Sequence, residues 1–301
     1  MGVEWCDLLA DLKNVLLASV KREAPRFNAQ EIANTLNGLA KMGVEWRDFS
    51  ADLKKDLLVS VKREAPRFNA QETANTFNGL AKMGVEWHDL SVELKKELLV
   101  SVKREAPRFN SQDIANTLNG LAKMGVEWCD LSSDLKKELL ASVKREAPGF
   151  IPQHVANTLN GLAKMGVEWD DLSADLKNVL LVSVKRATTT FNSQDIANIL
   201  WSLTTMLYYD ESIERVLLDR IVTLNFNEIT KCQILLALTY IKAYTGREHV
   251  LNLSAELEIT DSKLHQDVFK ILQELYPAAE KEYRLGVQGV LSVDCFIPAE
   301  N

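Results

Sequence analysis

The sequence predicts an all-α protein, an α-solenoid of two-helix repeats, with a short and incomplete α/β segment at its C-terminal end. The word Met-Gly-Val-Glu-Trp recurs every 41 residues, beginning at Met1, Met42, Met83, Met124 and Met165. A period in this range is typical of solenoids. Each unit holds two stretches with apolar residues at helical spacing. Because two such helices cannot bury their apolar faces alone, we expect the units to stack into an elongated, right-handed array.

The first helix of each unit, helix A, is clearest in the second unit. Ser50 is a good N-cap residue and predicts that the helix begins after it. Pro66 predicts its end, because proline lacks an N–H group and disfavours a helical residue before it. The apolar face between them consists of Leu53, Leu57, Leu58, Val61 and Ala65.

The second helix, helix B, is clearest in the first unit. Asn28 and Glu31 have the spacing of a capping box, and Gly43 is placed for a left-handed C-cap. The fourth unit departs from this pattern, because Pro152 predicts the first helical position there. His154 stands where other units have the capping acid, and we expect it to be a surface residue. The apolar face of helix B in the first unit consists of Ile32, Ala33, Leu36, Leu39 and Ala40.

Three regions follow from this pattern. Residues 1–206 hold five near-identical repeats, and residues 207–260 hold a degenerate helical repeat. In that region Phe226-Asn227 and the apolar run from Ile234 to Leu238 echo the fifth unit at a shorter spacing. Residues 261–301 form the C-terminal segment.

Composition and charge limit the classes of function that the chain can have. No stretch of 18 or more apolar residues exists, so we expect no membrane span. Met1 already belongs to the first repeat, which favours an intracellular protein without a leader peptide. From Thr188 onward there are 9 Lys/Arg against 16 Asp/Glu, so this part accounts for the whole net charge of −7 and the preceding array is neutral. A neutral array is unlike the basic surface of a typical duplex-DNA binder.

The four cysteines, Cys6, Cys129, Cys232 and Cys295, are scattered without paired spacing. Cys6 and Cys129 share a repeat position that other units fill with Arg47, His88 or Asp170, as expected of a variable surface position. We therefore expect free thiols in a reducing compartment, with neither a disulfide nor a metal site.

One polar stripe on helix B, within an arc of roughly 60° opposite the leucines, is a candidate binding surface. Solvated helix faces usually favour Glu, Lys and Arg over Asn, which forms helices less well. The stripe suits a ligand surface lined with amides, but an asparagine ladder between stacked helices or the copying of residues by recent duplication also explains it. Its members are Gln30, Asn34, Asn37 and Lys41; Gln71, Asn75, Asn78 and Lys82; Gln112, Asn116, Asn119 and Lys123; and Gln153, Asn157, Asn160 and Lys164.

Two further sets of residues recur at fixed positions of the repeat, and each has a functional and a structural interpretation. Arg26, Arg67 and Arg108 precede helix B and are candidates for phosphate contacts, with exposed loop arginines as the alternative. A tryptophan follows helix B in the Glu-Trp word of the repeat. We expect it to pack between units, with base stacking as the alternative. The tryptophans are Trp5, Trp46, Trp87, Trp128 and Trp169.

The run from Phe150 through Pro152-Gln153 and Ala156-Asn157 to Gly166 resembles the octotricopeptide repeat of FAST-kinase-like proteins, as does the run from Ile196 to Leu203. Where that family has tryptophan, four units here carry asparagine, and only Trp201 keeps it. The near-identical units also resemble a repeat of unknown function in intracellular bacterial parasites. The resemblance implies residence in the bacterial cytoplasm, with delivery to a host possible, or in an organelle if the source is eukaryotic.

The C-terminal segment carries a second resemblance. The run from His265 to Val268, with Leu272 and Leu275, leads to Val290–Pro298, and together these are similar to the opening of a RAP domain. The later part of such a domain would follow Asn301. We therefore expect residues from about Gly286 to form at most an isolated hairpin, and we expect no nuclease activity, because Asp294 alone cannot hold a catalytic metal.

The octotricopeptide resemblance implies binding of single-stranded RNA, with an effect on RNA stability, processing or translation. A protein-interaction scaffold of the HEAT or armadillo kind is the first alternative, which the neutral array favours. An RNA-processing enzyme is the weakest, because no catalytic residues, cofactor motif, metal site or small-molecule substrate site can be identified in the sequence.

Overall fold

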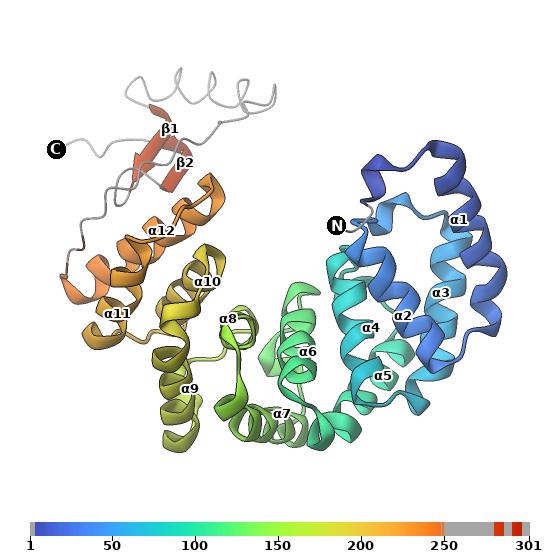
Figure 1. Cartoon of the computed structure of the whole chain (residues 1–301), viewed down its shortest axis with the longest axis horizontal. Helices are drawn as coiled ribbons and strands as arrows, with labels where there is room; N and C mark the ends of the chain where they lie inside the picture. The colour runs from blue at the N-terminus through green and yellow to red at the C-terminus, as the bar shows by residue number, and fades with distance from the viewer. Residues whose placement is uncertain (1–3, 248, 250–279, 286–290, 297–301) are drawn as a thin grey trace.

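The computed structural model describes residues 4–247, 249, 280–285 and 291–296, and within them twelve α-helices stack in pairs along an arc (Figure 1). None of the described helices is long and apolar enough to cross a membrane. The all-α solenoid is thus confirmed. Helix A of successive units is α1 (Ala10–Glu23), α3 (Ala51–Glu64), α5 (Val92–Glu105), α7 (Ser133–Glu146), α9 (Ala174–Ala187) and α11 (Glu211–Ile221). Helix B is α2 (Ala29–Lys41), α4 (Ala70–Lys82), α6 (Ser111–Lys123), α8 (Pro152–Lys164), α10 (Ser193–Thr205) and α12 (Glu228–Thr245).

The helix ends lie where the capping residues predict them. The Ser50 hydroxyl accepts a hydrogen bond from the Leu53 amide, and Asn28 and Glu31 form both bonds of the capping box. Gly43 has φ +79°, a left-handed conformation that favours glycine. Helix α3 ends at Glu64, just before Pro66 as expected, and a 3-10 turn, Ala65–Arg67, follows it.

Each unit is tied to its neighbour by two kinds of recurring hydrogen bond. The amide of Trp46 donates to the Met83 carbonyl of the next unit at 2.7 Å. The guanidinium of Arg104 donates to the carbonyls of Pro66 and Phe68 in the preceding unit, at 2.9 and 2.5 Å. These bonds satisfy main-chain groups at loops and helix ends that would otherwise lack partners. They recur along the array, so every junction has nearly the same geometry.

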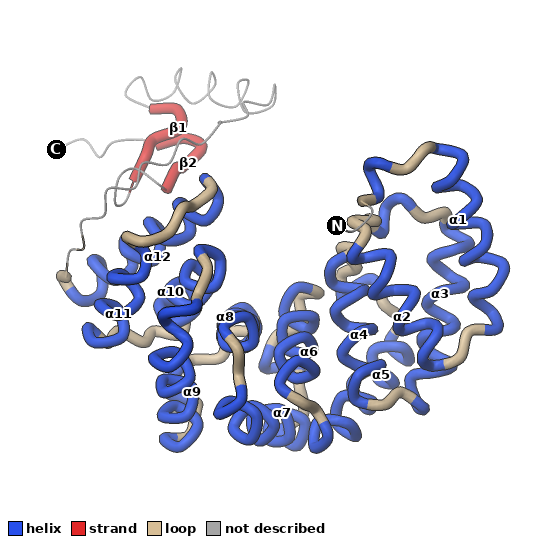
Figure 2. Tube along the Cα trace, viewed as in Figure 1, coloured by secondary structure: helices blue, strands red, loops and turns tan. Residues whose placement is uncertain are grey.

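Helices B approach each other much more closely than helices A do. Successive helices B are in contact along their length, whereas successive helices A touch at few points. Glycine permits this approach: a Cβ atom added at Gly120 would lie 2.9 Å from Cβ of Phe77 on the neighbouring α4. A stack that is tight on one side and loose on the other must curve. Helices B accordingly line the inner side of the arc, with α1, α3, α7 and α11 on the outside (Figures 1 and 2).

The sixth unit and the C-terminal strands complete the described chain. Helices α11 and α12 continue the stack, and Arg220 keeps the junction bond to the Phe191 carbonyl at 3.0 Å. Strands β1 (Glu280–Leu285) and β2 (Leu291–Phe296) pair antiparallel, with Tyr283 opposite Val293. A hairpin was expected only from about Gly286, so β1 begins earlier than predicted. The RAP-like run at His265–Leu275 lies outside the described residues.

Matched glycines test the role of close packing. Gly120→Ala should lower the free energy of unfolding by about 1–3 kcal/mol, because the new methyl group would collide with Phe77. Gly38 occupies the same repeat position at the open end of the array, with nothing within 4 Å of an added Cβ. Gly38→Ala should therefore raise stability by about 0.5–1 kcal/mol through its better helix propensity. Urea denaturation of the two variants decides this. Equal effects would contradict the proposed role of the glycine.

Candidate functional site

The polar stripe of helix B lies on the inner side of the arc, and its C-terminal half lines a cavity of about 650 Å³. Four successive helices B, from α6 to α12, contribute to this cavity. No carboxylate lines it. The lining residues are Asn119, Lys123, Asn157, Asn160, Lys164, Gln194, Asn198, Trp201, Cys232, Gln233 and Leu236.

The two asparagines of each stripe have different roles. Asn78, Asn119 and Asn160 are only 5–7% exposed. The Asn78 amide donates to Oδ1 of Asn37 in the preceding unit at 2.9 Å, and the Asn160 amide donates to Asn119 at 3.3 Å. They form two pairs, Asn37–Asn78 and Asn119–Asn160, of the asparagine ladder that was one of the open alternatives. Amides paired between helices have less capacity left for a ligand, although Asn119 and Asn160 also line the cavity. Their role at a ligand surface stays a prediction.

The remaining stripe residues are accessible. The glutamines Gln30, Gln71, Gln112 and Gln153 are exposed, as is Asn34. Asn75, Asn116 and Asn157 are half-buried and stand one helical turn before the ladder position. Each junction therefore presents one glutamine and one asparagine side chain, with both donor and acceptor capacity, to the inner surface.

Lys41, Lys82, Lys123 and Lys164 are exposed and form no ion pair with the described residues. Burial lowers the pKa of Lys123, and the charges of Lys164 and Lys82 lower it further. The row is thus close enough for its members to repel one another. By contrast, the outer lysines Lys21, Lys103 and Lys144 each contact an aspartate of the next unit at 2.8–2.9 Å. Unpaired, mutually repelling lysines on a surface lined with amides favour an anionic ligand.

The arginines lie elsewhere. Arg26, Arg67 and Arg108 end the 3-10 turns before helix B, and their side chains are 69–81% exposed. Their nearest acidic partners are Glu23, Glu64 and Glu105, at 3.9, 3.4 and 3.4 Å respectively. The length of helix B places each arginine roughly 20 Å from the lysine of its own unit. The structure therefore does not bring the arginines and the lysine row together.

The repeat tryptophans pack between units, as expected. Their main-chain amides donate across each junction, and their rings are half-buried or, at Trp169, buried. Trp87 stacks on Phe77 with ring centroids 6.4 Å apart, and Trp169 lies 4.5 Å from Tyr208. Packing thus accounts for these rings without base stacking.

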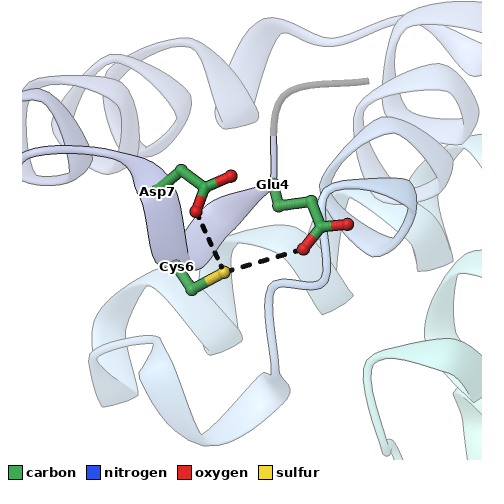
Figure 3. Close-up of side chains that lie close together, drawn as sticks. All are labelled: Glu4, Cys6 and Asp7. Carbon is green, nitrogen blue, oxygen red and sulfur yellow. Dashed lines mark hydrogen bonds between the residues drawn. The ribbon is translucent and has the colours of Figure 1, made fainter. Parts of the chain in front are cut away.

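His154 and the cysteines make no reactive centre. His154 is half-buried rather than a surface residue, and burial lowers its pKa. Cys6, Cys129 and Cys232 form no disulfide. The ligand atoms of Glu4, Cys6 and Asp7 lie within 4.8 Å of one another on the exposed surface (Figure 3). However, the negative charge of Asp7 raises the pKa of the Cys6 thiol, which disfavours the thiolate that a metal requires.

Sequence reasoning missed the part of the site contributed by the last two units. Gln194, Asn198 and Gln233 line the cavity beside Trp201, although none had been included in the stripe. Gln194 and Asn198 occupy the repeat positions of Gln153 and Asn157, so extension of the period by one unit would have found them. Gln233 was hidden by the shorter spacing of the sixth unit.

A family model described as a protein of unknown function (DUF1601) matches residues 1–36, 42–77, 83–118, 124–159 and 165–200. The chain belongs to the DUF1601 family. Each DUF1601 segment spans helix A and most of helix B, and the first four end one residue before the ladder asparagine. This match agrees with the resemblance of the units to a repeat of unknown function. The octotricopeptide and RAP resemblances remain predictions.

Curated proteins and solved structures provide two further comparisons. Comparison with curated proteins found no match. Among solved structures, a designed armadillo repeat protein in complex with the peptide (KR)4 is similar at 17% identity, over 70% of this chain and 92% of that chain, with a TM-score of 0.24.

The two asparagines of α6 give a matched test of the ladder. Asn119→Ala should cost about 1–3 kcal/mol of unfolding free energy, because it leaves the buried amide of Asn160 without its acceptor. Asn116→Ala, three residues earlier at a half-buried position, should change stability by less than about 0.5 kcal/mol. Thermal and urea denaturation measure both. A larger loss at Asn116 would show that the roles have been assigned the wrong way round.

Proposed function

We propose that the inner surface of the array binds single-stranded RNA and thereby influences RNA stability, processing or translation. The observation that carries the proposal is the row of unpaired lysines beside accessible amides, free of carboxylates where it lines the cavity. Lysines can contact phosphates irrespective of sequence, while amides can donate to and accept from base edges. The octotricopeptide resemblance supports the same function. The proposed activity is binding without catalysis, in a compartment that contains RNA, such as the bacterial cytoplasm.

A protein scaffold is the second candidate. The neutral charge of the array favours a scaffold, because an array with no net positive charge has no general attraction to nucleic acid. Exposed amides can also bond the main chain of an extended peptide. The lysine row restricts a peptide partner to acidic segments. The RNA-binding and scaffold functions can therefore be distinguished by whether RNA or an acidic polypeptide competes for the surface.

Competition between polymers provides the primary test. The first four units present the same glutamine, asparagine and lysine, so identical readers should prefer the same base. We expect one of poly-A, poly-U, poly-C and poly-G to compete best for a labelled RNA, through a tract of about four nucleotides. Poly-glutamate serves as the acidic peptide control. Equal competition by all four RNAs would show that the units do not each recognise a base. Binding of poly-glutamate but not of RNA would favour the protein scaffold.

The lysine row can be tested against lysines on the outside. Changing Lys41, Lys82, Lys123 and Lys164 to Gln should weaken RNA binding at every sequence. It should also reduce the slope of log affinity against log salt by up to about 3, the expectation for four single-strand phosphate contacts. Gel shifts at several salt concentrations measure this slope. The matched control changes the exposed helix A lysines Lys55, Lys96, Lys137 and Lys185 to Gln.

The control variant loses the same charge from a different surface, so it separates local contacts from net charge. We expect its salt slope to stay near that of the wild type. Equal slopes for both variants would mean that the stripe is not where the phosphates bind.

A further inference from the structure

The chemistry of the inner surface changes along the array. At the ladder position, asparagine in the first four units gives way to Trp201 in α10 and Leu236 in α12. At the lysine position, lysine in the first four units gives way to Thr205 and Tyr240. The inner surface therefore carries a lysine in each of the first four units, whereas in the last two units an aromatic or apolar side chain replaces the ladder asparagine. A repeated strand-binding surface does not by itself account for this change.

The cavity lies at the boundary between these two parts. Trp201 is half-buried and forms part of its lining, with Leu236 on the next helix. The Lys164 ammonium lies 5.9 Å from the Trp201 ring centroid. Lys164 is exposed on a flexible stem, so its charge can move from the ring to a bound anion without rearranging the fold.

Amides form the polar side of the cavity. Nε2 of Gln194 lies 3.0 Å from Oδ1 of Asn198, and Nε2 of Gln233 donates to the same oxygen at 3.1 Å. Nε2 of Gln194 also donates to Oε1 of Gln233 at 3.5 Å, so both of its hydrogens are engaged. Nε2 of Gln233 makes one such bond and retains a second hydrogen for a ligand. The network holds the amides in place, which lowers the entropic cost of using them to bind a ligand.

We propose that this cavity binds one unstacked nucleotide, with its base against Trp201, its base edge at the amide of Gln233, and its phosphate at Lys164 and Lys123. The volume of about 650 Å³ lies within the usual range of ligand pockets. A flat aromatic wall, fixed amides and a nearby cation are the three features that base stacking, edge recognition and phosphate contact require. This inference rests on the proposed function: the cavity anchors one end of the strand that the lysine row follows.

Nucleoside monophosphates are the probes, and intrinsic tryptophan fluorescence is the readout. Titration of the full chain with AMP, GMP, CMP or UMP should change the fluorescence, because stacking places the base on an indole ring. Trp201→Phe should abolish the change. Trp128→Phe is the matched control, since Trp128 is also half-buried with a lysine ammonium 5.9 Å from its ring, but lies outside the cavity. A change that persists in Trp201→Phe, or is absent with all four nucleotides, overturns the proposal.

Gel shifts with a single-stranded RNA separate this inference from the function on which it rests. Trp201→Leu should weaken RNA binding about tenfold or more, the usual effect of losing one stacked base, with an unchanged helical circular dichroism spectrum. If RNA binds the wild type and this variant equally and no nucleotide alters the fluorescence, the cavity proposal fails and the RNA function stands. If nucleotides act through Trp201 but RNA does not bind, the cavity is a nucleotide site and the RNA function fails.

Discussion

The close contact between helices B at their glycines is the constraint on which the rest of the structure depends. At Gly79, Gly120 and Gly161, an added Cβ would lie 2.8–2.9 Å from an atom of the preceding helix B. Helices A touch at few points on the outside, where arginine side chains bond to main-chain carbonyls of the preceding unit. The difference in spacing curves the stack. Curvature in turn gathers the polar stripes of successive units on one inner surface instead of distributing them around a straight rod.

The same contact divides each stripe into a structural and an accessible part. The ladder asparagine is next to the glycine in sequence, so it is drawn into the junction and must find a partner there. The amide of the adjacent unit supplies that partner. Residues one turn to either side, the asparagine before and the lysine after, remain at the surface. Close packing also brings the lysines near one another: burial lowers the pKa of Lys123, and the charges of Lys164 and Lys82 lower it further. An anion bound between them would relieve this repulsion, which supports the proposed binding of a polyanion.

Sequence reasoning predicted the fold well because its signals are local. A capping serine, a capping box and a left-handed glycine each define a helix end within a few residues, and the 41-residue period then repeats the result. The two asparagines of a stripe could not be separated in this way. Asn116 and Asn119 have the same chemistry and lie on the same face, and only the distance to the neighbouring helix makes one of them buried. Gly120 beside Asn119 marks the place where the neighbouring helix comes close, but the sequence does not say what occupies the room that a glycine leaves. Trp201 could not be recognised as part of a cavity because α12 forms one side of that cavity. The shortened spacing of the sixth unit concealed the place of α12 in the repeat.

Identical units create a problem of register that the C-terminal end of the array can solve. A surface that repeats the same amides and lysine four times offers a uniform polymer several equivalent positions, shifted by one unit, with nearly equal free energy. Such a surface would bind a strand without fixing where the strand begins or giving it a direction. Trp201, Leu236 and Gln233 differ from the residues at the same repeat positions in the earlier units, so a nucleotide held there would break the equivalence. Under the proposed RNA binding, the strand would have one preferred position and would extend from the cavity along the lysines toward α2. Near-identity of the units and divergence of the last two would then be complementary: the first would supply affinity that grows with length, and the second would determine the register.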